Sequence, residues 1–250
     1  MLVRFSELQD YKLISQNEER VGEVKDIYFD DASWTVRYLV VHPTTIAEKS
    51  AVLISPLAIE GPHATKRLLK VNLQHEHIRQ SPDVEERLPI SRQKEIELAE
   101  YYNWPVYWSK MAARVPGVVK ELSQTREPGA DVMEAHAEES PTNLRSADEM
   151  MRYNVIAKGE AVGHIDNFIV ETEYWKLPLV AVDVAPLRAG HSILVPPYLS
   201  QEVRWQEKAI HLNVDAAKLK QAPYYDKTTE ITEDIQHIYE QYFAMTPERS

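Results

Sequence analysis

The chain contains an internal repeat, and this repeat constrains the fold more than any other feature. The stretch VGEVKDIYFDDASWTVRYLVV begins at Val21, and VGHIDNFIVETEYWKLPLVAV begins at Val162. From Val21 onward the two copies stay in one register for about sixty residues, as far as Gln80-Ser81-Pro82 and Gln221-Ala222-Pro223. Before Val21 the offset changes by one residue, within a polar turn. We therefore expect two similar folding units, produced by duplication of one.

Each copy has the pattern of short β-strands. Tyr11, Leu13 and Ser15 alternate with polar residues, which is typical of a strand with one buried face. Val24 interrupts such an alternation in the first copy, and Ile165 interrupts it at the same place in the second, which indicates a shared β-bulge. About five strands per copy predict a small β-barrel, closed or nearly closed.

A helix is expected after each barrel. In the first copy, Ser91 is a suitable N-cap, and strong helix formers follow it as far as Glu100. In the second copy, four apolar residues recur at helical spacing and predict one buried helix face: Ile231, Ile235, Ile238 and Tyr242. The fold class is therefore mainly β, with two tandem small barrels that are each followed by an α-helix.

Three regions follow from these patterns. Residues 1–108 form the first barrel with its helix, and residues 144–250 form the second. Residues 109–143 are polar, acidic and poor in large apolar side chains, so they are predicted to be a flexible linker.

Composition excludes several classes of function. The chain has no cysteine, which excludes disulfides, thiolate nucleophiles and cysteine-based zinc sites. The net charge of -11 disfavours binding to nucleic acid or to anionic membrane surfaces. No signal peptide is visible, and no apolar run approaches the roughly 20 residues that span a bilayer. We expect a soluble cytoplasmic protein that does not insert directly into a membrane.

The polar clusters favour structural roles over chemistry. His75 and His77 would share one face of a strand and could begin a metal site, but the second copy keeps neither, and a solvated segment is the favoured interpretation. Asp26, Asp30 and Asp31 are interpreted as turn-forming and solvating residues. The chain has no G-x-S-x-G, G-x-G-x-x-G or P-loop pattern. We therefore predict no catalytic residue, no cofactor and no metal, and hence no enzyme.

Aromatic residues give the most suggestive candidate for a binding site. The segment YYNWPVYW contains five of them in eight positions: Tyr101, Tyr102, Trp104, Tyr107 and Trp108. Such a density either seals the open end of a barrel or forms a docking patch for a partner. Trp34 and Trp175 are instead expected in the barrel core or at its rim, and Gly22 and Gly163 at turns or bulges.

These residues together resemble a known family, the PRC-barrel domain. The resemblance lies in VGEVKDIYFDDASWTVRYLVV, VLISP, KVNLQHEHIRQSPDVE and PISRQKEIELAEYYNWPVYW, and it covers residues 1–108. The second copy, about 144–243, is similar more loosely. Proteins with two such domains and of about this length form a bacterial group. The family also includes the cytoplasmic part of the H subunit of the photosynthetic reaction centre and the C-terminal domain of a ribosome-maturation factor, and in both the barrel docks onto other proteins.

The resemblance implies a non-enzymatic interaction or scaffold module that binds a protein partner of unknown identity. Two alternatives remain open: an H-subunit-like component or regulator of a membrane-associated photosynthetic electron-transfer complex, and a hydrolase with a site in the cleft between the domains. We also expect either homo-oligomers or packing of the two barrels on each other, through an apolar face that contains Leu39 and Val180.

Overall fold

The computed structural model describes six stretches of the chain: residues 1–44, 49–63, 66–84, 90–107, 142–184 and 192–244. Strands account for 42% of these residues and helices for 27%, so the fold is mainly β, as predicted. The predicted linker 109–143 lies almost entirely outside the described residues.

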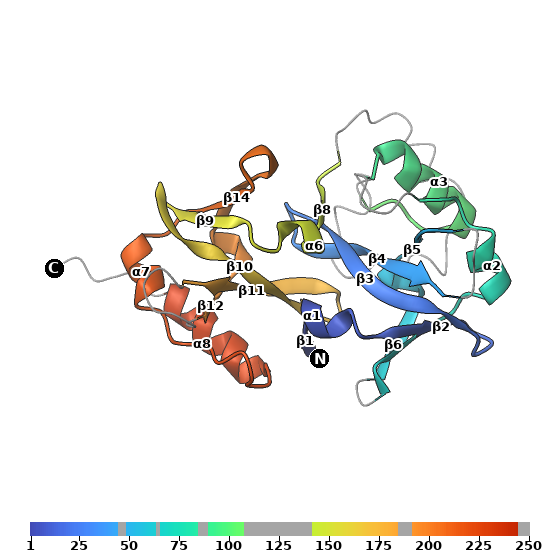
Figure 1. Cartoon of the computed structure of the whole chain (residues 1–250), viewed down its shortest axis with the longest axis horizontal. Coiled ribbons are helices and arrows are strands. Elements are labelled where there is room, and N and C mark those ends of the chain that lie inside the picture. Colours follow the sequence, from blue (N-terminus) through green and yellow to red (C-terminus); the bar gives the residue numbers. More distant parts are fainter. Residues whose placement is uncertain (45–48, 64–65, 85–89, 108–141, 185–191, 245–250) are drawn as a thin grey trace. The chain divides into compact units, whose positions relative to one another are not determined.

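Among the described residues, both copies contain the same series of elements, apart from the additional 3-10 helix η5 (Trp205–Glu207) in the second (Figure 1). The first runs through β1 (Leu2–Arg4), α1 (Phe5–Leu8), β2 (Lys12–Ile14), β3 (Arg20–Asp30), β4 (Thr35–Pro43), β5 (Val52–Ile54), the 3-10 helix η1 (Pro56–Ala58), β6 (Ile59–His63), β7 (Leu68–Val71), α2 (His75–Arg79) and α3 (Arg92–Tyr102). The second runs through β8 (Leu144–Ser146), α6 (Ala147–Met150), β9 (Asn154–Ala157), β10 (Glu160–Glu171), β11 (Lys176–Asp183), β12 (Ser192–Val195), η4 (Pro197–Leu199), β13 (Ser200–Arg204), η5 (Trp205–Glu207), β14 (Ala209–Leu212), α7 (Ala216–Lys220) and α8 (Glu233–Ala244).

The two copies also share one strand order. It is β6-β7-β2-β3-β4-β5 in the first copy and β13-β14-β9-β10-β11-β12 in the second. In each copy one pair of neighbours is parallel, β2 with β7 and β9 with β14. The pairs β2–β3, β4–β5 and β6–β7 of the first copy and β9–β10, β10–β11, β11–β12 and β13–β14 of the second are antiparallel. The agreement in strand order is the structural counterpart of the internal repeat.

The expected closure into barrels is not observed. Among the described residues, no pairing joins β5 to β6 or β12 to β13, so the strands of neither copy close into a barrel. The chain passes this corner through 3-10 helices that begin at Pro56 and Pro197. Proline has no N–H to donate to a strand ladder, so neither strand can be extended through this corner as a regular ladder.

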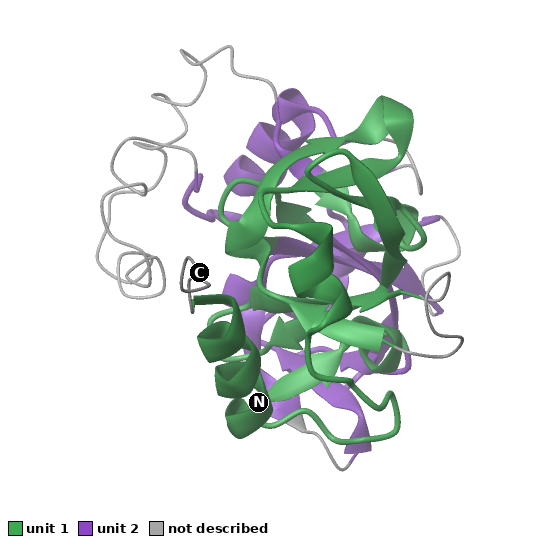
Figure 2. Ribbon diagram, turned by 90° about the vertical axis from the view of Figure 1, so that its left-hand side faces the viewer, with its two compact units in different colours: residues 1–9, 29–36, 145–250 green, residues 10–28, 37–144 purple. Residues whose placement is uncertain are grey.

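The chain folds into two compact units that do not follow the order of the sequence. Unit 1 contains residues 1–9, 29–36 and 145–250, and unit 2 contains residues 10–28 and 37–144 (Figure 2). The N-terminal segment and the tip of the β3–β4 hairpin therefore pack with the second copy. Whether 1–108 and 144–250 are independent domains stays a prediction.

Unit 1 shows how these two short segments of the first copy are held. Strand β1 pairs antiparallel with β10, with Leu2 opposite Glu171. Behind it, the side chains of Phe5 and Leu8 are almost completely buried. At the hairpin tip, Thr35 pairs with Lys176. The first copy thus contributes both backbone hydrogen bonds and core side chains to unit 1.

The repeated glycines occupy positions where no side chain fits. A Cβ built on Gly22 would lie 2.0 Å from the carbonyl oxygen of His42, and one on Gly163 would lie 2.0 Å from that of Asp183. The β9–β10 register shifts between Ala161 and Gly163, as expected of a bulge glycine. The β10–β11 register shifts between Ile165 and Asn167, which agrees with the bulge predicted at Ile165. Both glycines therefore allow a close approach of two backbones.

The two predicted helices are present, but one packs differently from the expectation. Helix α3 is capped by Ser91 as predicted. Of the predicted apolar face, Ile231 is buried and Ile235 and Tyr242 are half-buried, but Ile238 is 51% exposed. The buried residues of α8 itself are instead Tyr239 and Phe243, so the predicted face is wrong at Ile238. The hydroxyl of Tyr239 donates to the carbonyl of Pro223 at 2.7 Å, so this side of α8 faces the rest of unit 1. None of the described helices is long and apolar enough to cross a membrane.

Candidate functional site

Helix α3 of unit 2 positions the predicted aromatic residues. Its N-terminus is capped by the Ser91 hydroxyl, which accepts a hydrogen bond from the Lys94 N–H at 3.2 Å. Its C-terminus ends at Asn103, whose φ of 55° is left-handed, and the Trp104 N–H then donates back to the carbonyl of Ala99 at 2.9 Å. This cap reverses the chain and returns Trp104 to the end of α3.

Four rings form what we call the aromatic cluster: His77, Tyr101, Tyr102 and Trp104. The rings of Tyr102 and Trp104 are stacked, with centroids 4.2 Å apart, and Tyr101 meets Tyr102 edge-on at 4.8 Å. The His77 ring lies 4.8 Å from that of Tyr101, whose hydroxyl donates to the His77 carbonyl at 2.7 Å. Tyr102 is buried, whereas Tyr101 and Trp104 are half-buried. The cluster therefore packs on unit 2 through Tyr102 and exposes part of the Tyr101 and Trp104 rings to solvent.

A buried carboxyl lies on the same helix. The Glu95 side chain has no exposed surface, and its Oε1 accepts a hydrogen bond from the Arg92 guanidinium at 3.0 Å. The Tyr107 ring lies under two guanidinium groups, 4.1 Å from that of Arg37 and 5.8 Å from that of Arg92. We call Glu95, Arg92, Arg37, Tyr107 and the fully buried Tyr38 the Glu95 cluster.

Burial decides the protonation of this cluster. Loss of water raises the pKa of Glu95 to about 7, although Arg92 and the hydroxyl groups of Tyr107 and Thr142 lower it. Burial and the Glu95 charge likewise raise the pKa values of Tyr38 and Tyr107. Glu95 is therefore a carboxyl that exchanges its proton near neutral pH.

The second copy does not keep the Glu95 cluster. The positions of Glu95, Arg92, Arg37 and Tyr38 are taken there by Gln236, Glu233, Pro178 and Leu179. The second copy thus has an amide in place of the carboxyl, proline and glutamate in place of the two arginines, and leucine in place of the buried tyrosine. The two copies keep one strand order but differ at this polar cluster, so its role is specific to the first copy.

The predicted docking residues divide into three groups. Tyr101, Tyr102 and Trp104 come together in the aromatic cluster. Tyr107 belongs instead to the Glu95 cluster, and Trp108 lies outside the described residues. No sequence signal identified Glu95 as a site residue, since a glutamate in a helix rich in charged residues has the pattern of a solvated one.

The other candidates occupy structural positions. His75 and His77 lie on the helix α2, not on a strand, so they do not share the face that a strand would have given them. The Asp30 Oδ1 accepts hydrogen bonds from the Ala32 and Ser33 backbone N–H groups at 3.1 and 2.8 Å, as expected of a turn-forming residue. Within the described stretches, no group of three or more His, Asp or Glu side chains could hold a metal ion.

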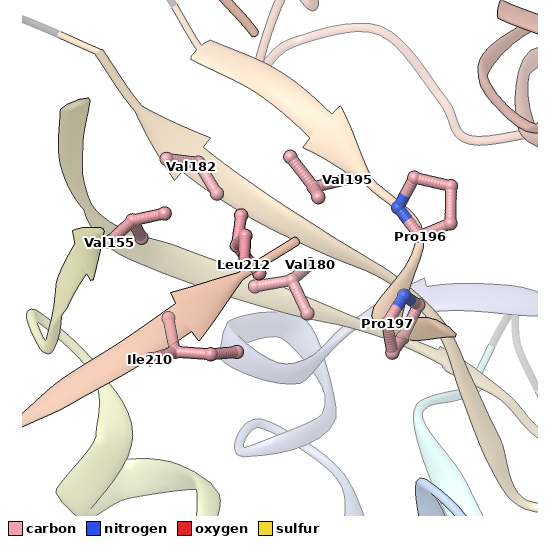
Figure 3. Close-up of a pocket in the computed structure, with 8 residues that line it drawn as sticks. All are labelled: Val155, Val180, Val182, Val195, Pro196, Pro197, Ile210 and Leu212. Carbon is pink, nitrogen blue, oxygen red and sulfur yellow. The ribbon is translucent and has the colours of Figure 1, made fainter. Parts of the chain in front are cut away.

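A small apolar cavity lies in unit 1, between the sheet and the corner at η4 (Figure 3). It has room for about one water-sized sphere. Its lining is wholly apolar: Val155, Val180, Val182, Val195, Pro196, Pro197, Ile210 and Leu212. Three of these valines stand where the first copy has the longer Leu13, Leu39 and Ile54. Val180 thus lines this cavity and is 3% exposed, and the packing of the two barrels through a face that contains Val180 stays a prediction.

Large exposed apolar side chains are found mainly on the second copy. Tyr174, Tyr198, Trp205 and Tyr224 are each more than half exposed, and so is Ile238. Trp205 follows Arg204 directly in the segment RWQEK, and a tryptophan surrounded by charged and polar residues is a sequence signal that would have identified it.

The strand order, the open sheets and the terminal helices define a mainly β protein with an internal repeat. Residues 1–57, which include β1 to β5, match the family model of the PRC-barrel domain. Residues 1–57 are therefore similar to a PRC-barrel domain. A comparison with curated proteins found no match for the chain.

Proposed function

We propose that the chain is a protein-interaction module and that the aromatic cluster of unit 2 is its docking surface. The observation that carries this proposal is the pair of half-buried rings of Tyr101 and Trp104, which pack on the buried Tyr102 and are held in place by the cap of α3. Aromatic rings held in one conformation lose little entropy on binding and bury a large area, which is why they dominate binding energies at interfaces. The PRC-barrel match supports a docking role, because members of this family dock onto other proteins.

We further propose that the second copy is a second PRC-barrel domain. The family model covers only residues 1–57, but both copies have the same strand order and the same backbone contact at Gly22 and Gly163. The chain would then be a tandem scaffold whose two copies bind different partners, since the aromatic residues of the first copy and the exposed Trp205 of the second differ.

The docking surface is tested by crosslinking and purification of the tagged protein from its native cells, followed by mass spectrometry. We expect a partner of unit 2 among the enriched proteins, and we expect Trp104→Ala to lower its recovery at least tenfold. Loss of one aromatic anchor commonly weakens binding by about 2 kcal/mol or more, which is a factor of about 30 in affinity.

The matched control is Trp205→Ala, which removes an exposed tryptophan from unit 1 and leaves the aromatic cluster intact. Both variants must keep the circular dichroism spectrum of the unsubstituted protein. Equal recovery of the partner with Trp104→Ala and with the unsubstituted protein would exclude the aromatic cluster as the docking surface.

A further inference from the structure

The position of Glu95 suggests a function that packing alone does not require. It lies on α3, and it is the only carboxyl among the described residues whose side chain has no exposed surface. Burial of a carboxyl without full compensation is costly, and a glutamine at this position, as in the second copy, avoids that cost.

The groups that face Glu95 come from four segments of unit 2. Arg92 lies on α3 itself, Arg37 and Tyr38 come from β4, Tyr107 follows α3, and Thr142 precedes β8. The side chains of Tyr107 and Thr142 both lower the pKa of the Glu95 carboxyl. These two residues lie at the two ends of the stretch 108–141. Glu95 is thus the point at which α3 meets both ends of the connection between the copies.

We propose that Glu95 is a proton-controlled latch for residues 104–107, which follow α3. These residues stay packed on α3 while the Glu95 carboxyl is protonated, and they loosen when the proton leaves. The packing itself is visible in Val106, which is 1% exposed and lies in one apolar cluster with Ile96 and Ala99 of α3. Regulation of the docking surface by this latch would rest on the function proposed above. The latch itself does not, since it concerns only the packing of the segment.

The direction of the pH effect follows from the raised pKa of Glu95. In the packed state this pKa is about 7, and in an opened, hydrated state it returns to the ordinary 4.5. The packed state therefore binds the proton more tightly, and it is most favoured at pH values below 4.5. As pH rises from 4.5 to 7, opening becomes easier, and above pH 7 the effect levels off. Between pH 6 and 8 the opening equilibrium should increase about tenfold.

The chain has no cysteine, so one introduced thiol can report the opening. Val106→Cys places a buried thiol under the latch, and Val214→Cys places a thiol of similar burial in unit 1 as the matched control. Each labelling rate with a neutral thiol reagent is divided by the rate of a free thiol at the same pH. We expect this ratio to rise about tenfold from pH 6 to 8 for Val106→Cys and to stay constant for Val214→Cys.

The same measurement with Glu95→Gln added should give a ratio that no longer depends on pH. With Tyr107→Phe added, the rise should persist but move to higher pH, because the lost hydroxyl had stabilised the ionised carboxyl. A merely structural role of Tyr107 would change the size of the ratio without moving its midpoint. Ala99→Cys, which lies in the same apolar cluster, serves as reporter if Val106→Cys does not fold.

Two outcomes would overturn the latch: a ratio that stays constant between pH 6 and 8 when Glu95 is present, or a rise that survives Glu95→Gln. Neither depends on a binding partner. A failed partner purification with an intact pH response would therefore remove the docking proposal and leave the latch, and the reverse result would remove only the latch.

Discussion

At the scale of single residues, the two copies share residues at positions with an unusual backbone conformation and differ at a buried polar cluster. Trp34 and Trp175 both adopt a left-handed backbone, with φ of 52° and 54°, which bulky residues rarely do. Both are buried, and their packing offsets the strain. Glu95, by contrast, has no acidic counterpart in the second copy. The shared features belong to the fold, and the unshared ones are the candidates for function.

The close backbone contact at Gly163 predicts a large effect of a single methyl group. Gly163→Ala would place its Cβ 2.0 Å from the Asp183 carbonyl oxygen, so β10 and β11 must separate. We expect a loss of about 3 kcal/mol in the free energy of unfolding, measured by urea denaturation.

Gly159→Ala is the matched control for that experiment. Gly159 has a φ of 88°, but no atom lies within 4 Å of its added Cβ, so the substitution strains only the backbone and should cost about 1 kcal/mol. Equal losses for the two variants would show that steric contact at Gly163 is unimportant.

At the scale of elements, equivalent helices are buried to different extents. Helix α3 buries Glu95, Ile96, Leu98, Ala99 and Tyr102. Helix α8 buries only Tyr239 and Phe243, at the positions of Leu98 and Tyr102, and leaves Ile238 in solvent. A helix of this length takes its stability mainly from the surface on which it packs, so the neighbouring residues decide how much of its apolar face is covered.

The cap of α3 gives a prediction at this scale. Ser91→Ala removes the hydroxyl that accepts from the Lys94 N–H, and it should lower the free energy of unfolding by about 1 kcal/mol. Thermal and urea unfolding measure the change. Gln93→Ala, an exposed substitution on the same helix without a capping role, should change the stability by less than about 0.5 kcal/mol. If both variants had the same stability, the cap would contribute nothing to α3.

At the scale of the whole molecule, the compact units cut across the repeat. Residues 1–9 are part of the first copy in sequence and part of unit 1 in space. They fill unit 1 with Phe5 and Leu8 and add β1 beside β10. A segment that crosses from one duplicated unit to the other links their stabilities, as exchanged segments do in symmetric dimers.

This exchange predicts where a mutation near the N-terminus acts. Leu8→Ala should lower stability by about 2–5 kcal/mol, because Leu8 is fully buried. Hydrogen exchange followed by mass spectrometry should show faster exchange in β10 than in the unsubstituted protein, with β7 of unit 2 much less affected. Faster exchange confined to residues 10–28 would contradict the assignment of this segment to unit 1.

How much could be predicted differed between these scales. The repeat, the mainly β content, the N-cap at Ser91 and the shared bulge all followed from local patterns, because alternation, capping and glycine positions act through near neighbours in the chain. The PRC-barrel family was recognisable for the same reason, since its motifs are local strings of residues. The open sheets were not predicted, because strand counts do not say which edges meet.

By itself, the sequence determined that one unit occurs twice in the chain. It also determined where the strands, turns and capped helix of that unit lie. Only the tertiary structure decided that residues 1–9 and 29–36 pack with the second copy, that Ile238 faces solvent, and that Glu95 is buried between arginines and tyrosines. The physical reason is that burial and pairing depend on residues far away in the chain. A local pattern states which face of an element is apolar or charged, and the contact that covers that face is made only when distant segments meet.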